Sequence, residues 1–229
     1  MPSVEEVLEM LAVKANPDQL AGMAKYGMNV EKRLGVNIPQ MRKIAKEIGK
    51  DHKLALELWE TGITEAMILA SMVDVPDDVT QEQMEAWAQN FDSWDVCDQV
   101  CMNLFDKTPL VWKKIHDWSD REEEFVKRAA YALIACLAVH DKGASDDVFI
   151  SLIPVIKAGA TDNRNYVKKA VSWALRNTGK RNLELNTVAL ATARELKGTD
   201  SSSARWIGSD AIRDLTSDTT KRRFERTKS

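Results

Sequence analysis

The chain has 229 residues, of which 44% are hydrophobic and 29% are charged, and its formal net charge is −3. This length and composition allow a substantial core and exclude a collagen-like or disordered chain. It contains no run of about 18 apolar residues that could span a bilayer. The start, MPSVEEVLEM, is acidic where a secretory signal would be basic and then apolar, so we expect a cytoplasmic protein with no membrane partner.

Almost every segment predicts a helix, because apolar residues recur three and four positions apart and helix start signals precede them. Strands find no support in the pattern. The predicted helices cover residues 3–11, 17–27, 37–49, 51–61, 64–73, 80–90, 92–106, 108–118, 122–139, 145–158, 163–178, 183–197 and 202–215.

Three helix starts carry recognisable local signals. Ser3 and Glu6 have the spacing of a capping box. Pro39 suits the first turn of a helix, because proline lacks the N–H that would be unpaired there. Thr108 is predicted to cap a helix that enters at Pro109.

The second half of the chain repeats itself. FVKRAAYAL begins at Phe125 and YVKKAVSWAL at Tyr166, an offset of 41 residues that Ala129, Ala170 and Ala211 continue. A period of about 40 to 47 residues is typical of HEAT and armadillo repeats, in which helix pairs stack and curve. We therefore predict an all-α fold, an α-solenoid of HEAT-like helical repeats with a concave cleft. The whole chain forms one domain, 1–229, whose last few residues fray.

Charge is unevenly distributed along the chain. Residues 1–120 hold 12 Lys and Arg against 21 Asp and Glu, whereas residues 121–229 hold 20 against 14. The stretch 163–183 carries six basic residues, Tyr166 and Trp173, and no acid. Basic residues interleaved with aromatic ones suit a surface that binds a polyanion. A solvated helix face with no ligand is the alternative.

The cysteines and histidines do not predict a metal site. Cys97 and Cys101 lie one helical turn apart without a second pair at ligand spacing, and the three histidines are scattered. With Cys136 they form an odd set that suits reduced thiols in the core. We expect neither a metal nor a cofactor.

Asp98 is the residue that the helical pattern explains least. In DSWDVCDQVCMNLF, Asp92 or Ser93 suits the N-cap, and Asp95 suits the first turn, where the helix dipole favours negative charge. Asp98 lies one turn further on, beside Trp94 at the edge of an apolar stripe. A carboxylate there costs free energy unless a cation meets it. That cation is either a basic side chain of the protein, with Arg128 as the obvious candidate, or a substrate.

Four stretches together resemble the AlkD-type DNA alkylation repair glycosylases, a family of HEAT-repeat proteins. They are YGMNVEKRLGVNIPQMRKIAKEIG, FDSWDVCD, EEFVKRAAYAL and NYVKKAVSWALRN, in that order along most of the chain. The resemblance implies an enzyme that removes cationic N3- and N7-alkylated purines from duplex DNA.

The same resemblance implies roles for individual residues. SWDVCD is similar to the family's catalytic helix, which makes Asp98 the catalytic carboxylate and Trp94 its neighbour four positions earlier. FVKRAA implies an active-site role for Arg128, and KKAVSWALR implies one for Trp173. Tyr26, in KYGMN, corresponds to a tyrosine that approaches the lesion.

The resemblance also implies that the predicted concave cleft is a DNA-binding cleft. Beside Tyr26, DNA contacts would come from Lys127, Lys168, Lys169 and Arg176. The implied activity is a hydrolase of base excision repair that releases 3-methyladenine and 7-methylguanine without base flipping. We expect a monomer with alkylated double-stranded DNA as its partner and no obligate protein partner. Two alternatives stay open: a noncatalytic HEAT scaffold that binds DNA, and a solenoid that binds protein.

Overall fold

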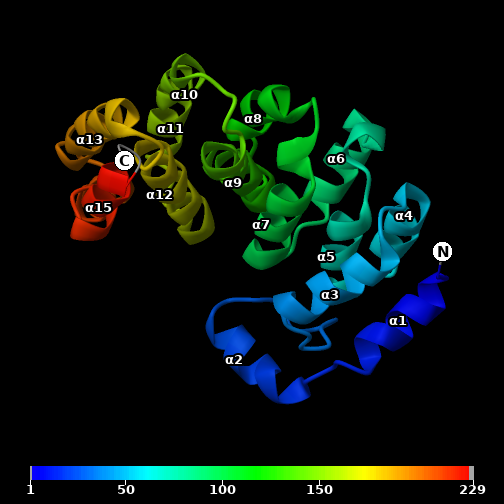
Figure 1. The fold of residues 1–229 in the computed structure, drawn as a ribbon. Coiled ribbons are helices and arrows are strands. Elements are labelled where there is room, and N and C mark those ends of the chain that lie inside the picture. Colours follow the sequence, from blue (N-terminus) through cyan, green and yellow to red (C-terminus); the bar gives the residue numbers. More distant parts are fainter. Residues whose placement is uncertain (1, 227–229) are drawn as a thin grey trace. The chain divides into compact units, whose positions relative to one another are not determined.

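The computed structural model describes residues 2–226, and within that range every regular element is a helix (Figure 1). The all-α prediction is therefore confirmed. The chain divides into two compact units, Met1–Leu110 and Val111–Ser229, which are described separately below. Among the described residues, none of the helices is both long and apolar enough to cross a membrane.

The first unit is built around one buried helix, α5. Its α-helices are α1 (Val4–Ala12), α2 (Leu20–Lys25), α3 (Ile38–Ile48), α4 (His52–Glu60), α5 (Thr64–Val73), α6 (Gln81–Gln89) and α7 (Trp94–Asn103), with short 3-10 turns at Pro17–Gln19, Pro76–Asp78 and Phe105–Lys107. Nearly every residue of α5 is buried, and the helix packs against α3, α4 and α7. Trp59 of α4 and Trp87 of α6 stack with ring centroids 4.0 Å apart and complete this core.

The second unit is built of helices that pack around α9 and α12. Its helices are α8 (Val111–Ser119), α9 (Glu124–His140), α10 (Asp146–Ser151), α11 (Ile153–Gly159), α12 (Asn165–Gly179), α13 (Leu183–Lys197), α14 (Ser202–Leu215) and α15 (Asp218–Arg226). Helix α9 packs against α8 and α12, and α12 packs in turn against α13 and α14. The last residues predicted to fray, 227–229, lie outside the described part of the chain.

The repeated positions of α9, α12 and α14 have equivalent environments. Ala129, Ala170 and Ala211 are all fully buried, as small residues at close helix contacts would be. Phe125 and Tyr166, which are related by the same 41-residue offset, lie against each other with ring centroids 5.4 Å apart. The repeat seen in the sequence is thus a repeat of packing positions.

Two of the three predicted helix starts are confirmed. Ser3 and Glu6 form the reciprocal capping box, with Ser3 N donating to Glu6 Oε2 at 2.8 Å and Glu6 N donating to Ser3 Oγ at 3.3 Å. Pro39 lies in the first turn of α3, which ends at Gly49 with φ +82°. Thr108 does not cap α8, because that helix begins at Val111 and the Thr108 hydroxyl donates to the carbonyl of Phe105 at 2.9 Å.

The predicted helix 145–158 is wrong as a single element, since it forms two helices, α10 and α11, that meet at Leu152. Pro154 explains the break, because proline has no N–H for the helical bond and its ring crowds the preceding turn. The predicted helix 92–106 is also too long, since α7 covers Trp94–Asn103 and a separate 3-10 turn follows.

Gly208 of α14 lies where this helix closely approaches α13, which gives a stability prediction. A Cβ added there would be 2.7 Å from the backbone nitrogen of Lys197 and would also collide with the carbonyl oxygen of Ala193, both in α13. Because backbone cannot move aside cheaply, Gly208→Ala is expected to destabilise the protein by about 3 kcal/mol in urea unfolding. Gly22→Ala in α2 is the control, since a Cβ there meets nothing within 4 Å. It should raise stability slightly, by about 0.5 kcal/mol. Equal effects of the two variants would contradict the close approach.

Candidate functional site

The N-terminus of α7 is held by a loop from far earlier in the chain. Of the two predicted N-cap residues, Asp92 and Ser93, it is Ser93 that occupies the N-cap, but its hydroxyl makes no capping bond. It donates instead to Asp95 Oδ1 at 2.5 Å and accepts from the backbone N–H of Asn29 at 3.3 Å. The side-chain Nδ2 of Asn29 also donates to Asp92 Oδ2 at 2.6 Å. The residues that could cap α7 are thus used to bind the loop.

Trp94 and Asp98 lie on successive turns of α7, and both are partly exposed. The indole Nε1 of Trp94 donates to the backbone carbonyl of Tyr26 at 3.0 Å. The Tyr26 side chain is 77% exposed. Of the predicted site residues, Tyr26, Trp94 and Asp98 therefore lie in the same unit, with the first two in direct contact.

Arg33 is a residue of this site that sequence reasoning missed. Its guanidinium makes a bidentate ion pair with Asp95, from Nη1 to Oδ2 at 2.7 Å and from Nη2 to Oδ1 at 3.1 Å. The side chains of Arg33 and Asp95 are only 4% and 13% exposed. Arg33 Nε also donates to the carbonyl of Asn29 at 2.9 Å. A guanidinium that binds both oxygens of a carboxylate fixes the orientation of the carboxylate as well as its distance. The Arg33–Asp95 pair therefore orients the first turn of α7.

A second missed residue, Glu65, lies beneath the same loop. Its carboxylate is 1% exposed and accepts three backbone N–H bonds, from Leu34, Gly35 and Val36, at 2.9, 2.8 and 3.3 Å. These donors replace the water that the buried charge has lost. A glutamate in the first turn of an apolar helix is the one signal in the sequence that could have pointed to it.

In the second unit, Arg128 of α9 is 5% exposed, and its Nη1 donates to the backbone carbonyl of Tyr166 at 2.6 Å. Trp173 lies on α12 and is partly exposed. Arg128 and Trp173 therefore belong to two helices that pack against each other. Asp98 and Trp94 lie in the other unit, so the meeting of all four residues in one site stays a prediction.

Asp162, which precedes α12, gathers basic side chains around it. Arg164 Nη2 donates to Asp162 Oδ2 at 2.6 Å, and Lys127 Nζ lies 3.3 Å from the same oxygen. The hydrogen bonds from Arg164 are the main cause that lowers the pKa of the Asp162 carboxyl to about 2. The Asp162 backbone carbonyl also accepts from Ser203 at the start of α14. Lys127, predicted to bind DNA, thus has a structural partner as well.

Two of the six basic residues in the acid-free stretch 163–183 pair with carboxylates of α14. Arg176 lies 3.3 Å from Asp210 and 3.3 Å from Asp214, and Lys180 lies 2.9 Å from Asp214. Among the described residues, Lys168 and Lys169 form no ion pair. The DNA contact predicted for Arg176 stays a prediction, and the structure gives this residue an internal role in addition.

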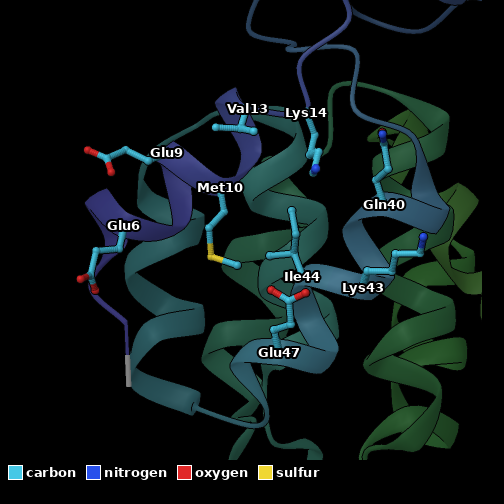
Figure 2. Close-up of a pocket in the computed structure, with 9 residues that line it drawn as sticks. All are labelled: Glu6, Glu9, Met10, Val13, Lys14, Gln40, Lys43, Ile44 and Glu47. Carbon is cyan, nitrogen blue, oxygen red and sulfur yellow. The ribbon is translucent and has the colours of Figure 1, made fainter.

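One groove of the first unit has a lining that does not include Asp98. A groove of about 560 Å³ opens between α1 and α3, with Met10, Val13 and Ile44 along it (Figure 2). Figure 2 shows Glu6 and Glu9 on its α1 side, and Gln40 and Lys43 on the other. None of these residues was predicted to act in catalysis.

The side chains of Cys97, Cys101 and Cys136 are buried, as expected of core thiols. Across the part of the chain that the structure describes, no three His, Cys, Asp or Glu side chains gather as a metal site would require.

The Arg33–Asp95 pair predicts a double-mutant result. Removing one partner leaves a nearly buried charge unpaired, so Arg33→Gln and Asp95→Asn should each lower the free energy of unfolding by about 3 kcal/mol. The double variant should lose much less than the sum, giving a coupling of about 2 kcal/mol in urea unfolding. Lys53 and Glu57, an exposed pair at 3.6 Å, provide the control cycle, with a coupling below about 0.5 kcal/mol. Additive effects at Arg33 and Asp95 would refute the role of the pair.

Asp162 predicts a pH dependence of stability. Its pKa is about 2 in the folded protein against an ordinary value of 3.8, so the unfolded chain takes up the proton first as the pH falls. The resulting stabilisation, about 2 kcal/mol, is present above pH 4 and lost between pH 4 and 2. Asp162→Asn should therefore be less stable than the wild type at pH 7, with the difference shrinking toward pH 2. Asp218→Asn, which removes an 82% exposed carboxylate, is the control. A constant difference across this range would contradict the assignment.

Solved structures give a fold comparison. One, described as representing "a new family of proteins related to the HEAT-like repeat DNA glycosylases with affinity for branched DNA structures", is 19% identical to this chain. It aligns over 93% of this chain and 95% of its own, with a TM-score of 0.76. The predicted HEAT-like helical-repeat fold is thereby confirmed. An engineered protein aligns over 94% of this chain and 99% of its own at 14% identity, with a TM-score of 0.45, too low to support an argument.

No curated protein matches the chain. The sequence pattern of the DNA alkylation repair enzymes, however, matches residues 7–215. This range takes in α2 to α14 and every predicted site residue. The chain therefore belongs to the DNA alkylation repair enzyme family.

Proposed function

We propose that the protein is a DNA glycosylase that hydrolyses the N-glycosidic bond of cationic N3- and N7-alkylated purines in duplex DNA. Its substrates are 3-methyladenine and 7-methylguanine, and its place is in base excision repair. It acts on the base without flipping it, as a cytoplasmic monomer. Family membership supports a role in alkylation repair, and the arrangement at the start of α7 supports the chemistry.

The single observation that carries the proposal is the position of Asp98. It lies in the second turn of α7, past the residues that serve the helix terminus, and it is partly exposed. One turn earlier, Trp94 is fixed by its hydrogen bond to Tyr26. A carboxylate on a rigid element with an anchored indole beside it is suited to stabilising positive charge.

The substrate explains why one carboxylate suffices. Alkylation at N3 or N7 makes the purine cationic, so the base can leave without being protonated and no general acid is needed. Positive charge then moves from the base to the sugar in an oxocarbenium-like transition state, as in glycoside hydrolysis. Ionised Asp98 would stabilise that charge and orient the attacking water. Trp94 and Trp173 would add cation–π attraction and exclude solvent.

Binding of the duplex would come from basic side chains. Lys168 and Lys169 are the best placed for phosphates, because neither is ion-paired among the described residues. Arg128, fixed by its bond to the Tyr166 carbonyl, would approach the backbone at the lesion. Lys127 and Arg176 would contact phosphates only in competition with Asp162, Asp210 and Asp214, their carboxylate partners.

Replacing Asp98 tests the activity. With methylated duplex DNA, the wild type should release free 7-methylguanine and 3-methyladenine, measured by chromatography, and should leave unmodified adenine and guanine in place. Asp98→Asn should slow the release by about 10²- to 10³-fold, because it removes the charge that stabilises the transition state. Asp77→Asn, which removes an exposed carboxylate of the same unit, should release both bases at the wild-type rate.

Two outcomes would overturn this proposal in different ways. Equal release by the wild type and Asp98→Asn would exclude Asp98 from the mechanism. No release by the wild type, with DNA binding retained, would favour the second candidate function, a noncatalytic protein that binds DNA. The solved relative described by its affinity for branched DNA is the observation that favours this candidate.

A further inference from the structure

The second unit displays an indole that the proposed reaction does not use. Trp206 of α14 is 41% exposed, whereas Trp59, Trp87 and Trp118 are 4%, 3% and 0% exposed. Tryptophan is usually well buried, and an indole left in water is common where a ligand covers it. Lys168 of α12 holds its ammonium 5.0 Å from the centre of the Trp206 ring.

Trp206 lies at the end of a row of side-chain contacts between α12 and α14, which we call the ladder. Ser172 donates to Asp210 at 2.7 Å, and Arg176 lies 3.3 Å from Asp214, each pair being 38 positions apart. One turn earlier on both helices, the same 38-residue relation pairs Lys168 with Trp206. An aromatic ring therefore stands at the end of the ladder where the other steps have a carboxylate.

Because this step of the ladder has an aromatic ring in place of a carboxylate, no carboxylate of the ladder balances the charge of the Lys168 ammonium. The carboxylate nearest along α14, Asp210, is already engaged by Ser172, Arg176 and Arg213. Among the described residues, Lys168 interacts with the ring alone, and Lys169 is exposed and forms no ion pair. Lys168 and an accessible indole thus lie together at one end of α12 and α14, and the exposed Lys169 is the next residue of α12.

Aromatic rings flanked by cations suit single-stranded nucleic acid. A base stacks on the ring, the cations meet the phosphates, and each stacked base contributes about 1–3 kcal/mol. Bases inside a duplex are covered on both faces by their neighbours and cannot stack on an external indole. A base that is unpaired can do so.

We propose that Trp206, Lys168 and Lys169 bind an unpaired nucleotide that adjoins duplex DNA. Trp206 stacks on the base, and the two lysines bind the flanking phosphates. The inference rests on the proposed function in one respect, since it assumes that the second unit meets DNA. It goes further by giving the protein a preference for DNA in which a paired stretch borders an unpaired one.

The test compares two DNAs in fluorescence anisotropy at one fixed salt concentration, a blunt duplex and the same duplex with a single-stranded overhang. The wild type should bind the overhang DNA more tightly. Trp206→Ala should weaken binding to the overhang DNA about tenfold more than binding to the blunt duplex. Trp206→Phe, which keeps an aromatic face, should retain most of the preference.

Two further variants separate stacking from charge and from general surface change. Lys169→Gln should weaken binding to both DNAs by a similar factor, because phosphates are present in both. Leu183→Ala, which truncates another exposed apolar side chain of this unit, should change neither. Circular dichroism and urea unfolding check that each variant is folded.

The results distinguish this inference from the proposed function. An unchanged ratio of the two affinities in Trp206→Ala, or a wild type with no preference for the overhang, overturns the inference and leaves Trp206 as a contact for some other partner. The glycosylase proposal is tested separately by base release from blunt methylated duplex. Loss of that activity alone, with the overhang preference intact, removes the proposed reaction but keeps the nucleotide site.

Discussion

The buried carboxylate of Glu65 fixes the segment on which the first unit's candidate site depends. Three backbone N–H groups, from Leu34, Gly35 and Val36, converge on it at 2.8 to 3.3 Å. A charge that has lost its water is tolerated only with such donors, so the carboxylate dictates the path of the chain between α2 and α3. Gly35 makes that path possible, because its φ is +80° and a Cβ there would collide with the backbone of Asn16.

The fixed path brings Arg33 to Asp95, 62 positions later in the chain, at the start of α7. Asp95 still serves the positive end of the helix dipole, because it lies in the first turn. The Ser93 hydroxyl does not make the usual capping bond and instead accepts a hydrogen bond from this loop. The direction of α7 is thus set from outside the helix, and with it the positions of Trp94 and Asp98. The catalytic role proposed for Asp98 would benefit from such support, because small displacements of a charge weaken its effect on a transition state.

Much of the fold could be predicted because each helix carries its own pattern. The 41-residue offset related Phe125 to Tyr166, and the two rings lie together. Helix ends were less predictable, since they depend on competition between local groups. Pro154 alone could have predicted the break in helix 145–158. The hydrogen bond from the Thr108 hydroxyl to the Phe105 carbonyl could not be predicted, because it depends on the turn that joins these two residues.

Charge was the property that the sequence represented least well. A stretch of 21 residues, 163–183, without one acid suggested a strongly basic face, yet Asp210 and Asp214 of α14 neutralise Arg176. A count along the chain cannot reveal this, because ion pairing depends on which faces of two helices meet. Less positive charge is therefore available to bind DNA phosphates than the sequence suggests. Contacts to phosphates alone also cannot distinguish a damaged base from an undamaged one. In the proposed reaction, recognition would then depend on groups that sense the base itself. An aromatic ring and the Asp98 carboxylate would do so, because they would favour a base that carries a positive charge over one that does not.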